Sequence, residues 1–217
     1  MRVLVSWSSG KDSAWALHTL RSNGSNVVGL LTTLNEDAGR VSLQGVRREL
    51  LYVQADAVGL PVWEVPLPSP CPNDEYERRM GATVERAVDE GITHIAFGDL
   101  FLEDVREYRE KKMAATGIEP LFPIWCGENE TGALAERMVS SGVRAIITCV
   151  DPSQLDRSFV GQAWQPGSLP PGVDPLGERG EFHTFCWAGP MFPSPIRTTP
   201  GEVVERDGFW WADLTPQ

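Results

Sequence analysis

Eight consecutive residues near the start of the sequence carry side chains suited to holding a phosphate group. The segment 6–13 reads Ser-Trp-Ser-Ser-Gly-Lys-Asp-Ser. Small residues let the backbone come close to an anion, hydroxyls can donate hydrogen bonds to it, and a lysine adds positive charge. The residues expected to contact a bound nucleotide here are Ser6, Ser8, Ser9, Gly10, Lys11, Asp12 and Ser13.

The neighbours of this segment predict a turn from a strand into a helix. The apolar run 3–5 predicts a buried strand, and Ala14, Leu17 and Leu20 recur at the spacing of one helix face. The first N–H groups of a helix are free, and the helix dipole adds positive potential there. We therefore expect an anion site at this turn. The alternative is an ordinary helix cap made by Ser8 or Ser9.

Asp12 indicates which anion this site would bind. A carboxylate beside a polyphosphate is repelled unless a cation such as Mg²⁺ lies between them, so the expected ligand is a metal-bound nucleotide with Asp12 as the metal ligand. The spacing differs from that of a Walker A loop, because Asp12 stands where Ser or Thr would follow the lysine.

A second group of reactive side chains lies near the other end of the chain. Glu178, Glu181, His183 and Thr184 fall within seven residues that also include Gly180. Such a group could orient a substrate, accept a proton from an amine or hold Mg²⁺. A surface turn with solvated acidic residues is the alternative interpretation.

Strands and helices alternate between these two groups, which predicts a Rossmann-like α/β fold with a parallel sheet covered by helices on both faces. We expect strands over 3–5, 27–34, 61–65, 93–97 and 143–150, and helices over 46–58, 74–90, 103–116 and 131–141. Ligands of such sheets lie beyond the carboxyl ends of the strands. The pairs Thr32-Thr33 and Gly98-Asp99 should therefore lie near the loop 6–13, with Thr32 and Gly98 expected to contact the nucleotide.

The composition changes after about residue 150. Gly and Pro crowd the segment 166–180, and the remaining apolar stretches are short and bounded by turns. We expect a nucleotide-binding domain over 1–150 and a small β-rich lobe over 151–217 that selects the substrate.

The net charge and the cysteine content limit the classes of protein to which this chain could belong. A net charge of −11 and a pI near 4.7 argue against a broad surface for nucleic acid. The four cysteines form no CxxC pair, and no apolar run reaches membrane-spanning length, so we expect a cytoplasmic protein. A homodimer is compatible with this composition.

The loop 6–13 resembles the pyrophosphate-binding loop, SxGGxDS, of the N-type ATP pyrophosphatases. Members of that superfamily cleave ATP between the α and β phosphates and adenylylate a carboxylate or carbonyl. Ser9 departs from the pattern, because it stands where the first glycine of the pair usually lies.

The segment Gly177-Glu-Arg-Gly-Glu-Phe-His-Thr184 is similar to a motif of the diphthine–ammonia ligase family, whose members also begin with such a loop. The resemblance spans essentially the whole chain and implies ATP-dependent amidation of diphthine, a modified histidine of elongation factor 2, by ammonium. It further implies ATP and Mg²⁺ as cofactors, and the catalytic residues expected are Lys11, Asp12, Asp99 and Glu181. Alternatives stay open: an ATP- or AMP-binding protein of the same superfamily that acts as a sensor or on a different small acceptor, or a tRNA-modifying enzyme of that superfamily.

Overall fold

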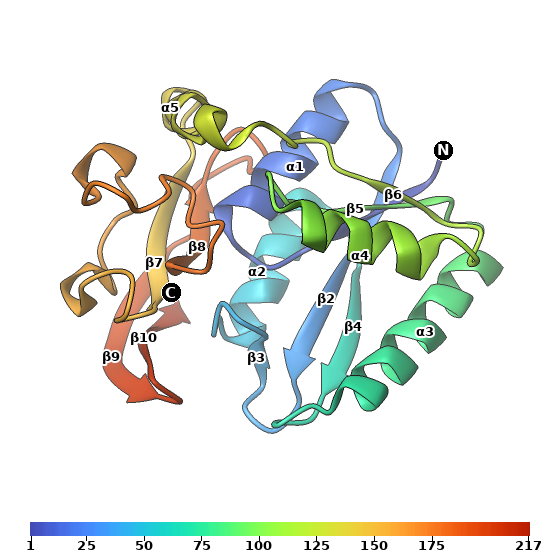
Figure 1. Cartoon of the computed structure of the whole chain (residues 1–217), viewed down its shortest axis with the longest axis horizontal. Helices are drawn as coiled ribbons and strands as arrows, with labels where there is room; N and C mark the ends of the chain where they lie inside the picture. Colours follow the sequence, from blue (N-terminus) through green and yellow to red (C-terminus); the bar gives the residue numbers. More distant parts are fainter.

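The computed structural model describes residues 1–217 and contains two separate sheets (Figure 1). The first has six strands, of which all but β3 run parallel to their neighbours. The parallel strands follow the order β4-β2-β1-β5-β6, with bounds β1 (Val3–Ser6), β2 (Val27–Asn35), β4 (Val62–Leu67), β5 (His94–Ala96) and β6 (Glu119–Leu121). β1 lies at the centre, so the loop that follows it opens at the middle of the carboxyl edge.

Helices cover both faces of the parallel sheet, as the alternation of strands and helices predicts. The helices are α1 (Lys11–Ser22), α2 (Arg48–Val58), α3 (Asn73–Asp89), α4 (Glu103–Met113) and α5 (Thr131–Ser140). Val3 and Val5 of β1 pack in the larger core with α1 and α2, whereas Leu4 packs in a second core with α3 and α4. Alternate residues of a strand point to opposite faces, which explains this division.

The second sheet is antiparallel and has the order β8-β7-β10-β9. Its strands are β7 (Arg144–Val150), β8 (Phe182–Ala188), β9 (Thr198–Arg206) and β10 (Phe209–Pro216). The sequence predicts a strand over 143–150 correctly, but its assignment to the parallel sheet is wrong. The run is apolar enough for either sheet, and pairing with β8 and β10 decides between them. The boundary expected at residue 150 stays a prediction, although this sheet begins at Arg144.

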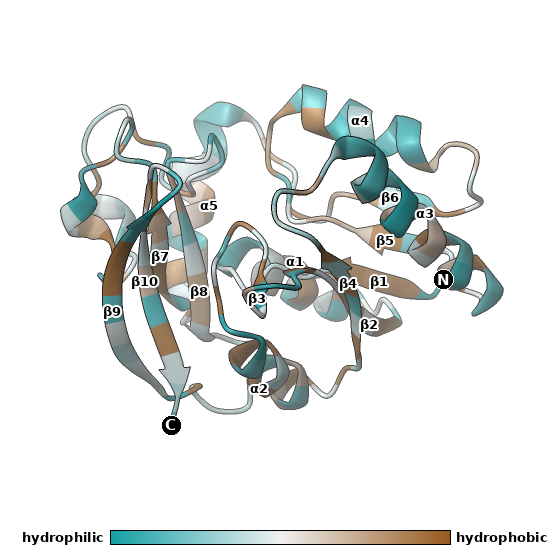
Figure 2. Cartoon of the chain, turned by 90° about the horizontal axis from the view of Figure 1, so that it is seen from below, coloured by the Kyte–Doolittle hydropathy of each residue, from teal (hydrophilic) through white to brown (hydrophobic).

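The two sheets lie side by side with α1 and α2 between them, while α3 and α4 cover the far face of the parallel sheet (Figures 1 and 2). Hydrophilic residues predominate on α3 and α4, and hydrophobic residues on β1 (Figure 2). One cluster of 37 buried residues joins both sheets. No helix is long and apolar enough to cross a membrane.

A short hairpin that the sequence pattern does not predict connects the two sheets. β3 (Arg40–Val41) pairs antiparallel with the end of β2. Asp213 of β10 accepts hydrogen bonds from the guanidinium groups of Arg40 at 2.8 Å and of Arg47 at 2.7 and 2.9 Å. These bonds hold the pKa of Asp213 down to about 2, with Arg47 the larger cause. The hairpin is thereby fixed to the second sheet.

Candidate active site

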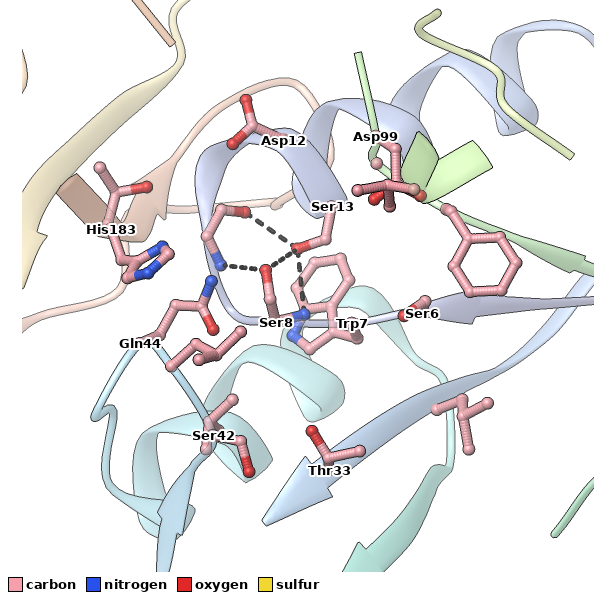
Figure 3. Close-up of a pocket in the computed structure, with 18 of the residues that line it drawn as sticks. Ser6, Trp7, Ser8, Asp12, Ser13, Thr33, Ser42, Gln44, Asp99 and His183 are labelled. Carbon is pink, nitrogen blue, oxygen red and sulfur yellow. Dashed lines mark hydrogen bonds between the residues drawn. The ribbon is translucent and has the colours of Figure 1, made fainter. Parts of the chain in front are cut away.

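A cavity of about 660 Å³ lies at the carboxyl ends of the parallel strands. Residues from the loop 6–13, the end of β2, the β3 hairpin, the end of β5 and the segment 176–184 line it. In Figure 3, Gln44 and His183 lie on one side of this space, Thr33 below it and Asp99 across from them. The segments that sequence analysis selects separately thus meet in one place, which is the arrangement expected for a ligand site in an open α/β sheet.

Hydroxyl groups hold the loop between β1 and α1 in shape. Ser13 Oγ accepts from the Ser8 N–H at 3.3 Å and donates to the Gly10 carbonyl at 3.1 Å. Ser8 Oγ accepts from the Gly10 N–H at 3.3 Å and lies 3.2 Å from Ser13 Oγ (Figure 3). Ser8 and Ser13 therefore brace the turn, and both also line the cavity.

The N-terminus of α1 presents free donors to the cavity. The N–H groups of Asp12 and Ser13 have no acceptor in another residue, since the first helical bond runs from Ala14 to Gly10; the Asp12 N–H faces its own carboxylate. Gly98 lies so close that an added Cβ would be 3.0 Å from the Ser13 nitrogen. The helix N-terminus and its dipole give this corner a positive potential, so it suits an anion such as a phosphate.

Ser9 occupies the left-handed region of backbone space, with φ of 68°. This region favours glycine, which explains why the related loops carry glycine here. The Ser9 carbonyl accepts from the Gln54 side chain at 3.0 Å and from the Cys186 N–H at 2.9 Å. Its Oγ is buried without a partner, and Ser9 does not line the cavity. Tertiary contacts therefore hold Ser9 in a conformation that its own side chain disfavours.

Gln54 is a site residue that sequence analysis does not find. Its fully buried side chain accepts from Trp7 Nε1 at 3.0 Å and donates to the carbonyls of Ser9 and Cys186, at 3.0 and 2.7 Å. A polar residue at an apolar position of the helix predicted over 46–58 is the only local signal. Gln54 joins α2, the loop and β8, and so supports the loop from behind.

Lys11 is almost fully buried, and its ammonium group faces the C-terminal segment. Nζ donates to Asp12 Oδ2 at 2.9 Å and to the Leu176 carbonyl at 2.5 Å. It also lies 5.2 Å from the ring centre of Phe182 and 5.5 Å from that of Trp164. Hydrogen bonds and cation–π contacts therefore stabilise the buried charge.

Asp12 is the residue best suited to Mg²⁺. Burial raises the pKa of its carboxyl group, while Lys11 acts in the opposite direction. Asp12 Oδ1 is buried without a partner, so the oxygen is available to a cation. No group of three or more metal-ligating side chains exists, but Mg²⁺ is commonly held by one or two carboxylates together with substrate phosphates. The donor set fits a nucleotide-bound Mg²⁺ on that basis.

The residues predicted at the carboxyl ends of the strands have different environments. Asp99 lines the cavity and pairs with Arg109, whose Nε lies 2.5 Å from Asp99 Oδ2. Ser6 lines the cavity as well. Of the predicted pair Thr32-Thr33, Thr33 lines the cavity. Thr32 does not, because its buried hydroxyl donates to the Trp7 carbonyl at 2.9 Å.

The C-terminal motif contributes directly to the loop. Thr184 Oγ1 accepts from the Lys11 N–H at 3.2 Å. His183 lines the cavity, and burial, with the nearby charge of Lys11, lowers its pKa to about 4, so its imidazole is neutral. Glu178 lines the cavity too, whereas Glu181 does not. The motif is therefore part of the wall of the same cavity as the loop 6–13.

The carboxylate of Glu181 is buried, and both of its oxygens accept hydrogen bonds from backbone N–H groups. Its Oε1 accepts from the Asp174 N–H and its Oε2 from the Arg179 N–H, both at 3.0 Å. Asp174 in turn accepts from the Glu178 N–H at 2.9 Å. These bonds order the turn 174–181, which carries Glu178 to the cavity.

This strand–loop–helix turn, at the carboxyl edge of a parallel sheet covered on both faces, places the protein in the α/β class. A model of the diphthamide synthase N-terminal domain matches residues 1–120, more than half of the chain. The chain therefore belongs to the diphthamide synthase family, as the two sequence motifs predict.

Curated relatives support the same assignment. Proteins named diphthine–ammonia ligase are 27% identical in Bos taurus, over 99% of this chain and 89% of the relative, and 25% identical in Danio rerio, over 94% and 89%. The Homo sapiens protein of that name is 26% identical, over 94% of this chain and 85% of its own. The chain is thus a member of a family of ligases.

A solved structure, described as a predicted subunit of tRNA methyltransferase from Methanocaldococcus jannaschii, shares 18% identity. It aligns with a TM-score of 0.42 over 67% of this chain and 80% of its own. Similarity at this level carries no argument about function.

Proposed function

We propose that the protein is an ATP-dependent amide ligase that adenylylates the carboxylate of a diphthine-like acceptor and amidates it with ammonium, releasing AMP and pyrophosphate. The observation that carries the proposal is the contact of two distant motifs at one cavity. Thr184 and Cys186 of β8 bond the loop at Lys11 and Ser9. The names of the relatives, which cover nearly the whole chain, support the same reaction.

The free N–H groups at the start of α1 would receive the ATP phosphates, with Ser8 and Ser13 close by. Asp12 would hold Mg²⁺ through its unpartnered oxygen, and the ion when bound would neutralise part of the phosphate charge. Lys11 lies next to Asp12 and would add a second positive charge near the departing pyrophosphate. This arrangement supports cleavage between the α and β phosphates.

The acceptor would enter from the side of the cavity walled by the segment 176–184 and the β3 hairpin. Its carboxylate attacks the α phosphate, and ammonia then displaces AMP from the acyl carbon. We further propose that the C-terminal sheet selects the acceptor, for which elongation factor 2 bearing diphthine is the candidate. The four free cysteines support a cytoplasmic reaction.

The test is to incubate the protein with MgATP, ammonium and diphthine-bearing elongation factor 2. AMP, pyrophosphate and the mass change of a carboxylate becoming an amide are all expected, and only when the acceptor is present. A sensor would return ATP intact. Release of ADP and phosphate would contradict cleavage at the α phosphate and with it the proposed function.

A further inference from the structure

Three carboxylates line the same cavity, and only two of them have a cationic partner. Asp12 pairs with Lys11 at 2.9 Å, and Asp99 pairs with Arg109 at 2.5 Å. Glu178 forms no ion pair with any residue of the chain, although it lies near both other acids. Glu178 is therefore the only one of the three carboxylates without a directly paired cation, although the nearby charge of Lys11 acts to lower its pKa.

The carboxylate of Glu178 is fixed through one oxygen and free at the other. Oε1 accepts from the Leu100 N–H at 2.7 Å, and the Glu178 N–H donates to Asp174 at 2.9 Å, so backbone and side chain are both held. Oε2 makes no hydrogen bond within the chain and is not fully buried, and Glu178 lines the cavity. Burial raises the pKa of Glu178 to about 7, the Leu100 N–H opposes this, and the charges of Asp12 and Asp99 add to it.

The other candidates for a base are less suitable. Both oxygens of Glu181 are used by backbone N–H groups, and Glu181 does not line the cavity. Asp99 forms an ion pair with the Arg109 guanidinium, so its carboxylate already has a cationic partner. His183 is neutral, with a pKa near 4, and a neutral imidazole provides no charge to attract a cation.

We propose that Glu178 is the catalytic residue that binds ammonium and removes its proton, an inference that rests on the proposed amide ligase function. One N–H bond of ammonium breaks, and its proton passes to Glu178 Oε2. The nitrogen lone pair then forms the C–N bond to the acyl carbon, and the C–O bond to AMP breaks with its electrons on the phosphate oxygen. A second proton leaves nitrogen for solvent as the amide forms.

The experiment separates the two half-reactions in Glu178→Gln. Glutamine keeps an oxygen for the Leu100 N–H but provides no proton acceptor of comparable strength. Exchange of labelled pyrophosphate into ATP, dependent on the acceptor, should stay close to wild type, while amide formation from ammonium falls at least about a hundredfold, the usual contribution of a general base. Hydroxylamine, a nucleophile that is mostly unprotonated at neutral pH, should restore product formation. Glu178→Asp keeps a carboxylate and should retain part of the ammonium-dependent rate.

Glu181→Gln is the matched control in the same motif. It removes a carboxylate outside the cavity, so it should lower the melting temperature and affect both half-reactions together. Ammonium use by Glu178→Gln at the wild-type rate would overturn the inference, as would loss of its pyrophosphate exchange. Absence of exchange in the wild type would instead refute the proposed function, and the inference with it.

Discussion

Replacing Ser9 with glycine should stabilise the protein, even though the residue lies in the nucleotide loop. Two features disfavour serine here, a backbone φ of 68° and a buried Oγ without a partner. An L residue in the left-handed region costs about 1 to 2 kcal/mol. Glycine removes this backbone strain. Its greater freedom in the unfolded chain offsets about 0.5 to 1 kcal/mol of that gain. An unsatisfied buried hydroxyl costs roughly 1 to 3 kcal/mol.

Two variants separate these contributions. Ser9→Ala removes only the hydroxyl and should raise the free energy of unfolding by about 1 to 2 kcal/mol. Ser9→Gly should add about another 0.5 to 1 kcal/mol, because it also relieves the backbone. Urea unfolding without nucleotide, followed by tryptophan fluorescence, measures both. If Ser9→Gly is less stable than Ser9→Ala, the residue is not strained, and the explanation given for the departure from the paired-glycine pattern is wrong.

Four further substitutions test residues that line or support the cavity. Gln54→Leu should lower the free energy of unfolding by about 3 kcal/mol in urea titrations, because it leaves a buried indole donor unsatisfied and removes two further buried bonds; a loss under about 1 kcal/mol would contradict its role. Asp213→Asn should lower the free energy of unfolding by about 1 to 2 kcal/mol near neutral pH. This value allows for the partial exposure of the Asp213 carboxylate to solvent. The difference should vanish as pH falls from about 4 to 2, because the depressed pKa of Asp213 stabilises the fold only above its unfolded value. Glu178 has a raised pKa of about 7, so the folded state holds a proton that the unfolded state releases; stability should fall as pH rises from about 4.5 to 7. In the wild type, the free energy of unfolding should fall by roughly 2 to 3 kcal/mol over this range, and in Glu178→Gln this fall should be absent. If the free energies of the two proteins changed with pH in parallel, the raised pKa of Glu178 would be refuted. Lys11→Met should weaken ATP binding by on the order of 2 kcal/mol in calorimetric titration, whereas equal affinities would show that its buried ammonium does not reach the nucleotide.

Local patterns account for most of the parallel sheet. The apolar runs and the glycines and prolines between them give β1, β2, β4 and β5 within a few residues. The strand at 144–150 shows the limit of this reasoning, because a continuous apolar run fits a parallel or an antiparallel sheet. Only its pairing with β8, more than thirty residues later, assigns it to the second sheet.

The site residues that sequence analysis misplaces or misses depend on contacts between distant parts of the chain. Gln54 bonds Cys186, 132 positions away, and nothing in α2 alone indicates that partner. Glu178 and Glu181 share one short glycine-containing turn and similar neighbours, yet one lines the cavity and the other binds backbone. Their orientations follow from how the turn packs on Leu100 and Asp174, which spacing cannot reveal.

The dependence of the loop on β8 has a consequence for biosynthesis. The loop leaves the ribosome early, but the Cys186 N–H and Thr184 hydroxyl that hold it are translated more than 170 residues later. A nascent chain that stops before β8 therefore has the nucleotide motif without the contacts that keep Ser9 in its conformation. Under the proposed function, the nucleotide site is thus incomplete until β8 has also been translated.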